Sequence, residues 1–215
     1  MNKELSVIVS SCDKYSHLLP YFTKLFDKYW DCKDRFDKYI CVESADINFP
    51  GYQTIHTADT NWSNSLAKTL AHIDTPYVFI ILDDFWPIRH IETEDIERGL
   101  RIAKEHNLDK YIYHYPHVVF EGKLDATGIA PNIYKVQQNS EYTMTVQPGL
   151  WNVEYLTNIL DGENPWEFEI SGSARANEKP HKIFMEVISP YHEEAMSRGQ
   201  FTPSYYKIIE REGLQ

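Results

Sequence analysis

The sequence predicts an α/β protein with a mostly parallel, Rossmann-like sheet flanked by helices. Short β-branched and aromatic runs alternate with amphipathic segments over the first hundred residues, and this alternation with short connections is typical of βαβ units. The run Tyr77–Leu82 is apolar throughout and is followed closely by Pro87, as expected of a fully buried strand. A length of 215 residues fits one large domain and is short for two.

Strands are predicted where short β-branched and aromatic runs are bounded by polar, Gly or Pro residues. In the first half these runs cover residues 5–11, 38–42, 52–56 and 77–82. In the second half they cover residues 111–115, 118–120, 133–138, 143–147 and 182–188. The second half is also interrupted by Gly122, Gly128 and Pro131, so we expect it to be the more irregular of the two.

Helices are predicted where apolar residues recur three or four positions apart. These segments cover residues 18–29, 62–73, 92–103 and 153–160, and a further helix opens at Asn164 and Pro165. Ser16 is the expected N-cap of the first helix, with Pro20 in its first turn. Pro165 suits the first position of its helix.

Composition and charge restrict the class of partner. The net charge of −11 argues against a nucleic-acid backbone. Aromatic residues make up 14% of the chain, which suits a surface for flat or sugar-like ligands and equally a Tyr-rich core. No apolar run reaches the roughly 20 residues of a membrane helix, and no signal-peptide pattern is expected. Cys12, Cys32 and Cys41 are expected to be reduced thiols.

Asp83 and Asp84 are the most informative residues of the chain because they directly follow the buried run Tyr77–Leu82. The carboxyl ends of strands in open α/β sheets are where ligands bind. Side chains alternate along a strand, so both acids cannot point into the core. Adjacent carboxylates repel each other unless a cation or a hydrogen-bonded ligand compensates them. The simplest such cation is a divalent metal that takes oxygen ligands.

Four segments of the first half form a recognisable pattern: Ser10 to Asp13 at a strand tip, Glu43-Ser44 after the second strand, Asn61 to Ser65 opening a helix, and Leu82 to Phe85. On these segments the chain resembles the GT-A fold glycosyltransferases, in the style of bacterial enzymes that build capsule or lipopolysaccharide. The resemblance covers residues 5–90 and extends weakly through residues 147–152, 164–169 and 197–199. It implies one domain over residues 1–215, with a nucleotide-sugar-binding half to about residue 90 and an acceptor and catalytic half from about residue 91.

The resemblance also implies a donor site. The residues implied to bind the nucleotide sugar are Ser11, Asp13, Glu43, Trp62, Asn64, Asp83 and Arg198. Simpler interpretations stay open for several of them: Trp62 shares a helical stripe with Leu66 and Leu70 and suits a core, Asp13 suits a helix start, and Glu43 suits a solvated strand end.

A divalent metal, Mn²⁺ or Mg²⁺, is implied to hold the donor's diphosphate, with Asp84 as a ligand and His192 as a late ligand for metal or diphosphate. The family pattern is Asp-any-Asp, whereas Phe85 stands two positions after Asp83. The metal would then have one firm protein ligand or none, which Mg²⁺ tolerates because it keeps several waters. A purely structural or solvent-facing role for His192 stays open.

A second carboxylate pair, Glu167 and Glu169, is expected in the first turn of the helix opened by Pro165. Inverting sugar transfer needs a base that takes the acceptor hydroxyl proton, and Trp166 and Phe168 would give it partly apolar surroundings. We favour Glu167, and residues two apart on a helix point in different directions, so one of the two is expected to face the site. Favourable interaction with the helix dipole is the alternative explanation.

The resemblance places Trp151 and Trp166 against the acceptor, while an ordinary core position for Trp151 stays open. The function it implies is transfer of a sugar from a nucleotide-diphosphate sugar to a hydroxyl of a glycan or glycolipid, in the cytoplasm, with peripheral contact at the inner membrane face left open. The alternatives are a non-catalytic domain that binds carbohydrate or a partner protein, and a nucleotidyltransferase. The last ranks lower because Ser10 to Lys14 lack the glycines of a triphosphate-binding loop.

Overall fold

A computed structural model describes residues 4–30, 35–114, 123–189 and 191–214. Nine strands form one sheet in the order β3-β2-β1-β4-β9-β6-β10-β8-β7. The first four strands in chain order are β1 (Leu5–Ser10), β2 (Asp37–Val42), β3 (Gln53–His56) and β4 (Tyr77–Leu82). They pair in parallel, which confirms the four strands and the parallel arrangement predicted for this half.

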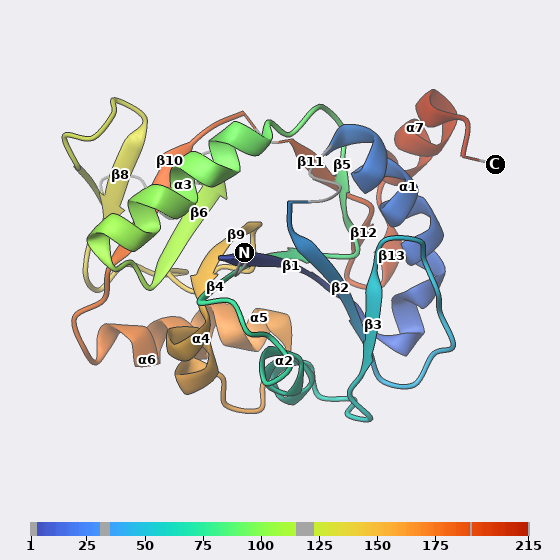
Figure 1. Cartoon of the computed structure of the whole chain (residues 1–215), viewed down its shortest axis with the longest axis horizontal. Coiled ribbons are helices and arrows are strands. Elements are labelled where there is room, and N and C mark those ends of the chain that lie inside the picture. Colours follow the sequence, from blue (N-terminus) through green and yellow to red (C-terminus); the bar gives the residue numbers. More distant parts are fainter. Residues whose placement is uncertain (1–3, 31–34, 115–122, 190, 215) are drawn as a thin grey trace.

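The second half of the chain extends the same sheet. Its strands are β6 (Lys110–His114), β7 (Leu124–Ala126), β8 (Ile133–Val136), β9 (Gly149–Asn152) and β10 (Ile183–Val187). Within the nine strands, β8 and β9 run against the others. The sheet is therefore mixed: seven of its nine strands run in one direction, as expected of the predicted mostly parallel sheet, while four of its eight pairings are antiparallel. It includes strands from both halves of the chain (Figure 1).

Helices cover both faces of the sheet (Figure 1). One core joins α1 (Leu19–Tyr29) and α3 (Thr93–His106) to side chains such as Val7 and Phe79. The other joins α2 (Trp62–Leu70) and α4 (Val153–Ile159) to Ile8 and Val78. Adjacent residues of one strand thus serve opposite cores, because side chains alternate across a sheet.

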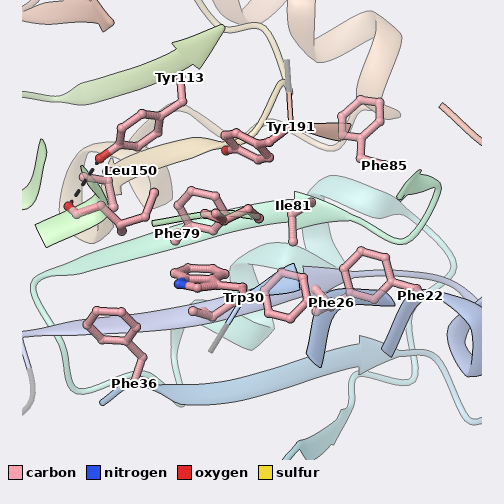
Figure 2. Close-up of a cluster of buried hydrophobic side chains, with 14 of the residues drawn as sticks. Phe22, Phe26, Trp30, Phe36, Phe79, Ile81, Phe85, Tyr113, Leu150 and Tyr191 are labelled. Atoms are coloured by element: carbon pink, nitrogen blue, oxygen red, sulfur yellow. Dashed lines mark hydrogen bonds between the residues drawn. The ribbon is translucent and has the colours of Figure 1, made fainter. Parts of the chain in front are cut away.

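The first of these cores is rich in aromatic rings (Figure 2). Phe26 packs with its ring centroid 5.1 Å from that of Trp30, and Trp30 lies 5.1 Å from Phe79. The Trp30 indole also donates a buried hydrogen bond to Thr93. Much of the aromatic surplus in the composition is therefore core.

The remaining elements follow or surround the carboxyl ends of the first strands. A 3₁₀ helix, η1 (Asp13–Leu18), leads into α1. The short strands β5 (Phe85–Pro87) and β11 (His192–Glu194) pair, as do β12 (Met196–Ser197) and β13 (Gln200–Phe201). The chain continues from α5 (Pro165–Glu167) through the π-helical η3 (Phe168–Gly172) to α6 (Ser173–Asn177), and α7 (Pro203–Glu212) lies near the C-terminus.

Two local predictions are wrong. Ser16 does not cap α1, because η1 precedes that helix and the Ser16 hydroxyl donates to the Asp13 carbonyl. Residues 143–147 do not form a strand, and the strand lies instead at β9, directly after them. Gly149 permits this placement, since a Cβ there would lie 2.6 Å from the Tyr111 carbonyl oxygen. The strand predicted over residues 118–120, together with Tyr115, Gly122 and Cys32, falls outside the described residues.

Candidate functional site

A cavity of about 690 Å³ lies at the carboxyl ends of β1, β2 and β4. Its wall also includes the start of α2, the loop before β9, the α5–η3 segment, and residues of β11 and β12. Eight of the residues proposed from sequence line it: Ser11, Asp13, Glu43, Trp62, Asp83, Asp84, Trp166 and Glu169. Parallel strands bring residues that are far apart in sequence to this one edge, where α/β folds bind ligands.

Asp83 is buried directly after β4 and is hydrogen-bonded to the residue that follows the adjacent strand, β1. Its Oδ2 accepts a hydrogen bond of 2.5 Å from the Ser11 hydroxyl. Burial, and then the neighbouring Asp84, raise the pKa of Asp83 well above its usual value, and the hydrogen bond from Ser11 only partly opposes this. The pair therefore offers a hydrogen-bonding group to a ligand at the junction of β1 and β4.

Asp84 follows Asp83 in the turn between β4 and β5. Its Oδ1 is buried and has no hydrogen-bond partner among the residues that the structure describes, while its backbone carbonyl accepts from Ala195 at 2.7 Å. Burial, followed by repulsion from Glu194, raises the pKa of Asp84 to about 7. Glu194, which was not singled out from sequence, lines the same cavity, and partial burial and then Glu169 raise its pKa too.

A divalent cation fits this end of the cavity. No group of three or more His, Cys, Asp or Glu residues in the described part of the chain could hold a metal by itself. The unpartnered Asp84 oxygen with Glu194 nearby instead fits a cation that takes one or two carboxylates and completes its shell with phosphate oxygens and water.

Asp13 and Glu43 support each other at the tips of β1 and β2. The backbone amide of Asp13 donates to the Glu43 carboxylate. The Asp13 carboxylate accepts from the Ser44 and Ala45 amides at 2.9–3.1 Å and from the Ser44 hydroxyl. Burial alone would raise the pKa of Asp13, but these hydrogen bonds outweigh it and hold the pKa far below its usual value. Asp13 is thus an ionised anchor for the loop after β2.

Trp62 packs against the second core and also lines the cavity. Its indole donates to the Ser10 hydroxyl at 3.0 Å and packs 5.3 Å from the Phe168 ring, yet the residue is half-buried and lines the cavity. Asn64 is exposed and does not line the cavity. Asn61 lines it in its place, and its side chain also caps α2. The implied binding role of Asn64 is therefore not supported by its position.

The structure reverses the preference between the two late glutamates. Glu167 is exposed and forms a capping box with Asn164, so its carboxylate accepts from the Asn164 amide at 3.1 Å, outside the cavity. Glu169 lines the cavity, and its Oε1 accepts from the Thr145 hydroxyl at 2.9 Å and the Val146 amide at 2.8 Å. One of the pair faces the cavity, as the helix geometry predicts, and it is Glu169.

The two tryptophans proposed for the acceptor lie in opposite environments. Trp151 is buried in the second core with the Phe168 ring 6.1 Å away, so its assignment to the acceptor surface is wrong. Trp166 is 62% exposed and stands on the cavity wall. Of the two tryptophans, Trp166 is the one with a ring accessible from the cavity.

Lys110 was missed from sequence although it is fully buried. Its Nζ lies 4.0 Å from the Trp151 ring centroid and donates to the Thr143 and Thr145 carbonyls at 3.1 and 2.5 Å. It thereby holds the turn that presents Thr145 and Val146 to Glu169. A lysine preceding a predicted strand is unremarkable in sequence, so no local signal could have identified this role.

His192 and Arg198 lie beside the cavity rather than on its wall. The buried His192 ring is 4.9 Å from Phe85, and its Nε2 is bonded to the Gln147 amide oxygen at 3.0 Å. This packed position does not support the implied metal role of His192. Arg198 lines an adjoining pocket of about 480 Å³ together with Lys14, Tyr15, Trp166 and Gly199.

No family model and no curated protein matches the chain, whereas solved structures do. TarS of S. aureus (residues 1–349), a glycosyltransferase with the GT-A fold, superposes with a TM-score of 0.58 at 14% identity. The match covers 88% of this chain and 59% of that one, so the chain spans under two thirds of it. A complex of the same protein with UDP gives the same TM-score over 96% of this chain.

Two nucleotidyltransferases are also similar. CMP:2-keto-3-deoxy-manno-octonic acid synthetase, solved with CTP, has a TM-score of 0.52 at 10% identity and covers 99% of both chains. UDP-glucose pyrophosphorylase, solved with UDP-glucose, has a TM-score of 0.55 at 8% identity over 89% of this chain and 92% of that one. The chain therefore has a GT-A-like fold, as predicted, and this fold is common to both kinds of enzyme.

The described helices include none that is long and apolar enough to span a bilayer.

Proposed function

We propose that the chain is a glycosyltransferase that moves a sugar from a nucleotide-diphosphate sugar to a hydroxyl of a glycan or glycolipid, with inversion at the anomeric carbon. The observation that supports this most is the arrangement of one cavity. Asp83 and Asp84 lie at the strand tips on one side, and Glu169 lines the same space from η3. A sugar donor bound at Asp83 and Asp84 would have its anomeric carbon in the same cavity as Glu169, the candidate base.

The donor would lie along the tips of β1, β2 and β4. The Ser11–Asp83 pair and Glu43 are suited to the ribose and base edges, because hydroxyl and amide groups of a nucleoside need polar partners when they leave water. The half-buried Trp62 provides a flat apolar wall beside them.

At the diphosphate, Asp84 is the residue suited to hold a divalent metal, with Glu194 beside it. Such a metal would act as a Lewis acid that neutralises charge on the leaving diphosphate. Asp84 Oδ1 is buried and accepts no hydrogen bond from the described residues, so it is left to accept from, or coordinate, a ligand.

Glu169 is the proposed base. The hydrogen bonds from Thr145 and Val146 fix one carboxylate oxygen, and the carboxylate would take the proton from the acceptor hydroxyl as that oxygen attacks the anomeric carbon. Lys110 supports this geometry by anchoring the carbonyls of Thr143 and Thr145. Trp166, at the cavity wall, is suited to contact the acceptor.

A nucleotidyltransferase fits the same fold but not the loop after β1. Triphosphate binding uses free backbone amides in a Gly-rich loop. Here the Asp13 amide donates to Glu43 and the Tyr15 amide donates to the Cys12 carbonyl. The loop is thus internally bonded, which favours glycosyl transfer over nucleotidyl transfer.

The test is a thermal-shift panel of UDP-, GDP-, CMP- and dTDP-sugars with and without Mn²⁺ or Mg²⁺. A ligand at ~100 times its dissociation constant stabilises the fold by about 2.7 kcal/mol. We expect one class of nucleotide sugar to stabilise the protein. When a mixture of glycan acceptors is added, we expect the protein to convert that nucleotide sugar to its nucleoside diphosphate. Release of pyrophosphate from a nucleoside triphosphate and a sugar 1-phosphate would show the nucleotidyltransferase instead. Binding without any turnover would show a non-catalytic domain.

A further inference from the structure

The smaller pocket beside the main cavity has a charge opposite to that of the protein. It is about 480 Å³ and is lined by Lys14, Tyr15, Trp166, Arg198 and Gly199. No acidic residue is among those lining residues, in a chain with a net charge of −11. Since the overall field repels anions, an anion can be bound only where cations are placed locally.

Both cations are available to a ligand. Lys14 and Arg198 are exposed, and neither forms an ion pair with any residue that the structure describes. The Lys14 ammonium lies 5.0 Å from the centroid of the Tyr15 ring. By contrast, Arg35, Arg98 and Arg175 each contact a carboxylate.

The backbone holds Arg198 in an uncommon conformation. Arg198 and Gly199 form the two-residue turn between β12 and β13, with φ values of 51° and 77°. Turns of this kind favour Asn, Asp or Gly at both positions, so an arginine at the first position is held there at a cost in backbone energy. Strain of this kind is concentrated at binding sites. The turn also lies close to Tyr15, whose hydroxyl would be 3.6 Å from a Cβ added at Gly199.

Exposed aromatic rings occur on the pocket wall, at Trp166, and on β13 and α7, which follow the Arg198–Gly199 turn in sequence. Trp166 is 62% exposed and lines both this pocket and the main cavity. Phe201, just after the turn, is 39% exposed and stacks 4.0 Å from Tyr205, and Tyr206 is 61% exposed. Large exposed rings grouped beside a concave site indicate a binding surface, and their flat faces with nearby polar groups suit sugar rings.

We infer that this pocket is an acceptor subsite that binds a phosphate or carboxylate group on the acceptor glycan. The inference rests on the proposed function, because the shared wall of Lys14, Tyr15 and Trp166 connects the pocket to the cavity that contains Glu169. The anionic group would contact the guanidinium of Arg198, whose planar fork of donors matches phosphate and carboxylate oxygens. Arg198 is thereby assigned to the acceptor instead of the donor diphosphate.

The experiment compares three small probes on the full chain: glucose 6-phosphate, glucuronic acid and glucose. Their affinities are measured by calorimetry. If one nucleotide sugar stabilises the protein in the thermal-shift panel, the nucleoside part of that donor is present as its free nucleotide; otherwise no nucleotide is added. We expect at least one charged probe to bind about tenfold more tightly than glucose. Preference for the phosphate or for the carboxylate identifies the source of the charge.

Arg198→Gln is expected to remove this preference, and Arg198→Lys to retain part of it. The matched control is Arg101→Gln, which removes an equally exposed arginine from α3 and is expected to keep the preference. Donor stabilisation in the thermal-shift panel is expected to stay the same in Arg198→Gln.

Three results would overturn the inference. The first is equal binding of glucose and its charged derivatives by the wild-type protein. The second is loss of nucleotide-sugar stabilisation in Arg198→Gln, which would return Arg198 to the donor site. The third is Arg198-dependent sedimentation with phosphatidylglycerol vesicles in the absence of any probe preference, which would indicate a lipid surface. Failure of every nucleotide sugar to stabilise the wild type would instead reject the proposed function, whatever the probes show.

Discussion

The Thr145 hydroxyl donates a hydrogen bond of 2.9 Å to Oε1 of Glu169. This contact joins the turn before β9 to the π-helical segment η3, and both line the cavity at the tips of the parallel strands. Glu167, two residues earlier, faces away and caps α5. The two glutamates therefore have separable roles.

Glu169→Gln is expected to lower the rate of sugar transfer by about 10²–10⁴-fold, the range for loss of a general base, while donor binding in the thermal-shift panel is unchanged. The amide oxygen can still accept from Thr145 and Val146, so the fold should be retained. Rates with and without acceptor, measured as nucleoside diphosphate release, provide the check. Wild-type transfer by this variant would move the base to another residue.

Glu167 provides the matched control. Glu167→Gln keeps the capping box, because glutamine also serves at this position, and is expected to leave both stability and transfer unchanged. Glu167→Ala removes only the hydrogen bond that the Glu167 carboxylate accepts from the Asn164 amide, because Asn164 still caps α5, and should cost about 0.5–1.5 kcal/mol in urea unfolding. A loss of transfer in Glu167→Gln with normal donor binding would restore the preference drawn from sequence.

The two tryptophans are expected to respond oppositely. Trp151→Ala should lower the free energy of unfolding by about 3–5 kcal/mol, because it empties a buried site between Lys110 and Phe168. Trp166→Ala should change stability by less than about 0.5 kcal/mol, as is usual at exposed positions, and raise the KM for acceptor. Urea unfolding and acceptor titrations distinguish the two; similar losses of stability would contradict the burial difference.

Asp84 should make stability depend on pH. Its folded pKa of about 7 lies above the ordinary aspartate value, so between about pH 4 and pH 7 the folded state binds more protons than the unfolded state and stability falls as pH rises. Asp84→Asn lacks this titration. In protein treated with a chelator, the variant is expected to gain stability relative to wild type across this range. Parallel curves for the two proteins would contradict the shift.

The same variant tests the metal. If Asp84 is a ligand, the cation-dependent part of the donor-induced thermal shift should disappear in Asp84→Asn, while the protein stays folded. An unchanged cation effect would exclude Asp84 as the ligand.

Lys110 is expected to make stability rise with pH, the opposite of the effect expected from Asp84. Burial lowers the pKa of Lys110 well below its usual value, and Glu169 only partly opposes this. The unfolded state then binds more protons between the folded pKa and the ordinary lysine value of about 10.4, so stability rises with pH in that window. Lys110→Met should lack this rise, which unfolding curves at pH values from 7 to about 10 can measure. A matching rise in the variant would show that Lys110 is charged in the folded protein at neutral pH.

Local pattern was enough to predict most elements and the edge of the sheet that forms the cavity. The run before Asp83 had to be a strand, since it is apolar throughout and buried on both faces, and Asn164 and Pro165 had to open a helix because they supply a cap and a fixed φ. Alternation of strands and helices then brought Ser11, Glu43 and Asp83 to one edge.

Tertiary packing decided the rest. Whether Glu167 or Glu169 faces the cavity depends on the π-helical turn and on Thr145, which lies 24 residues away in sequence. The insertion of β9 between β4 and β6, the burial of Lys110 beneath Trp151, and the approach of Glu194 to Asp84 all arise from contacts between distant segments. Periodicity reports which face of an element is apolar, but not which distant side chains it will meet.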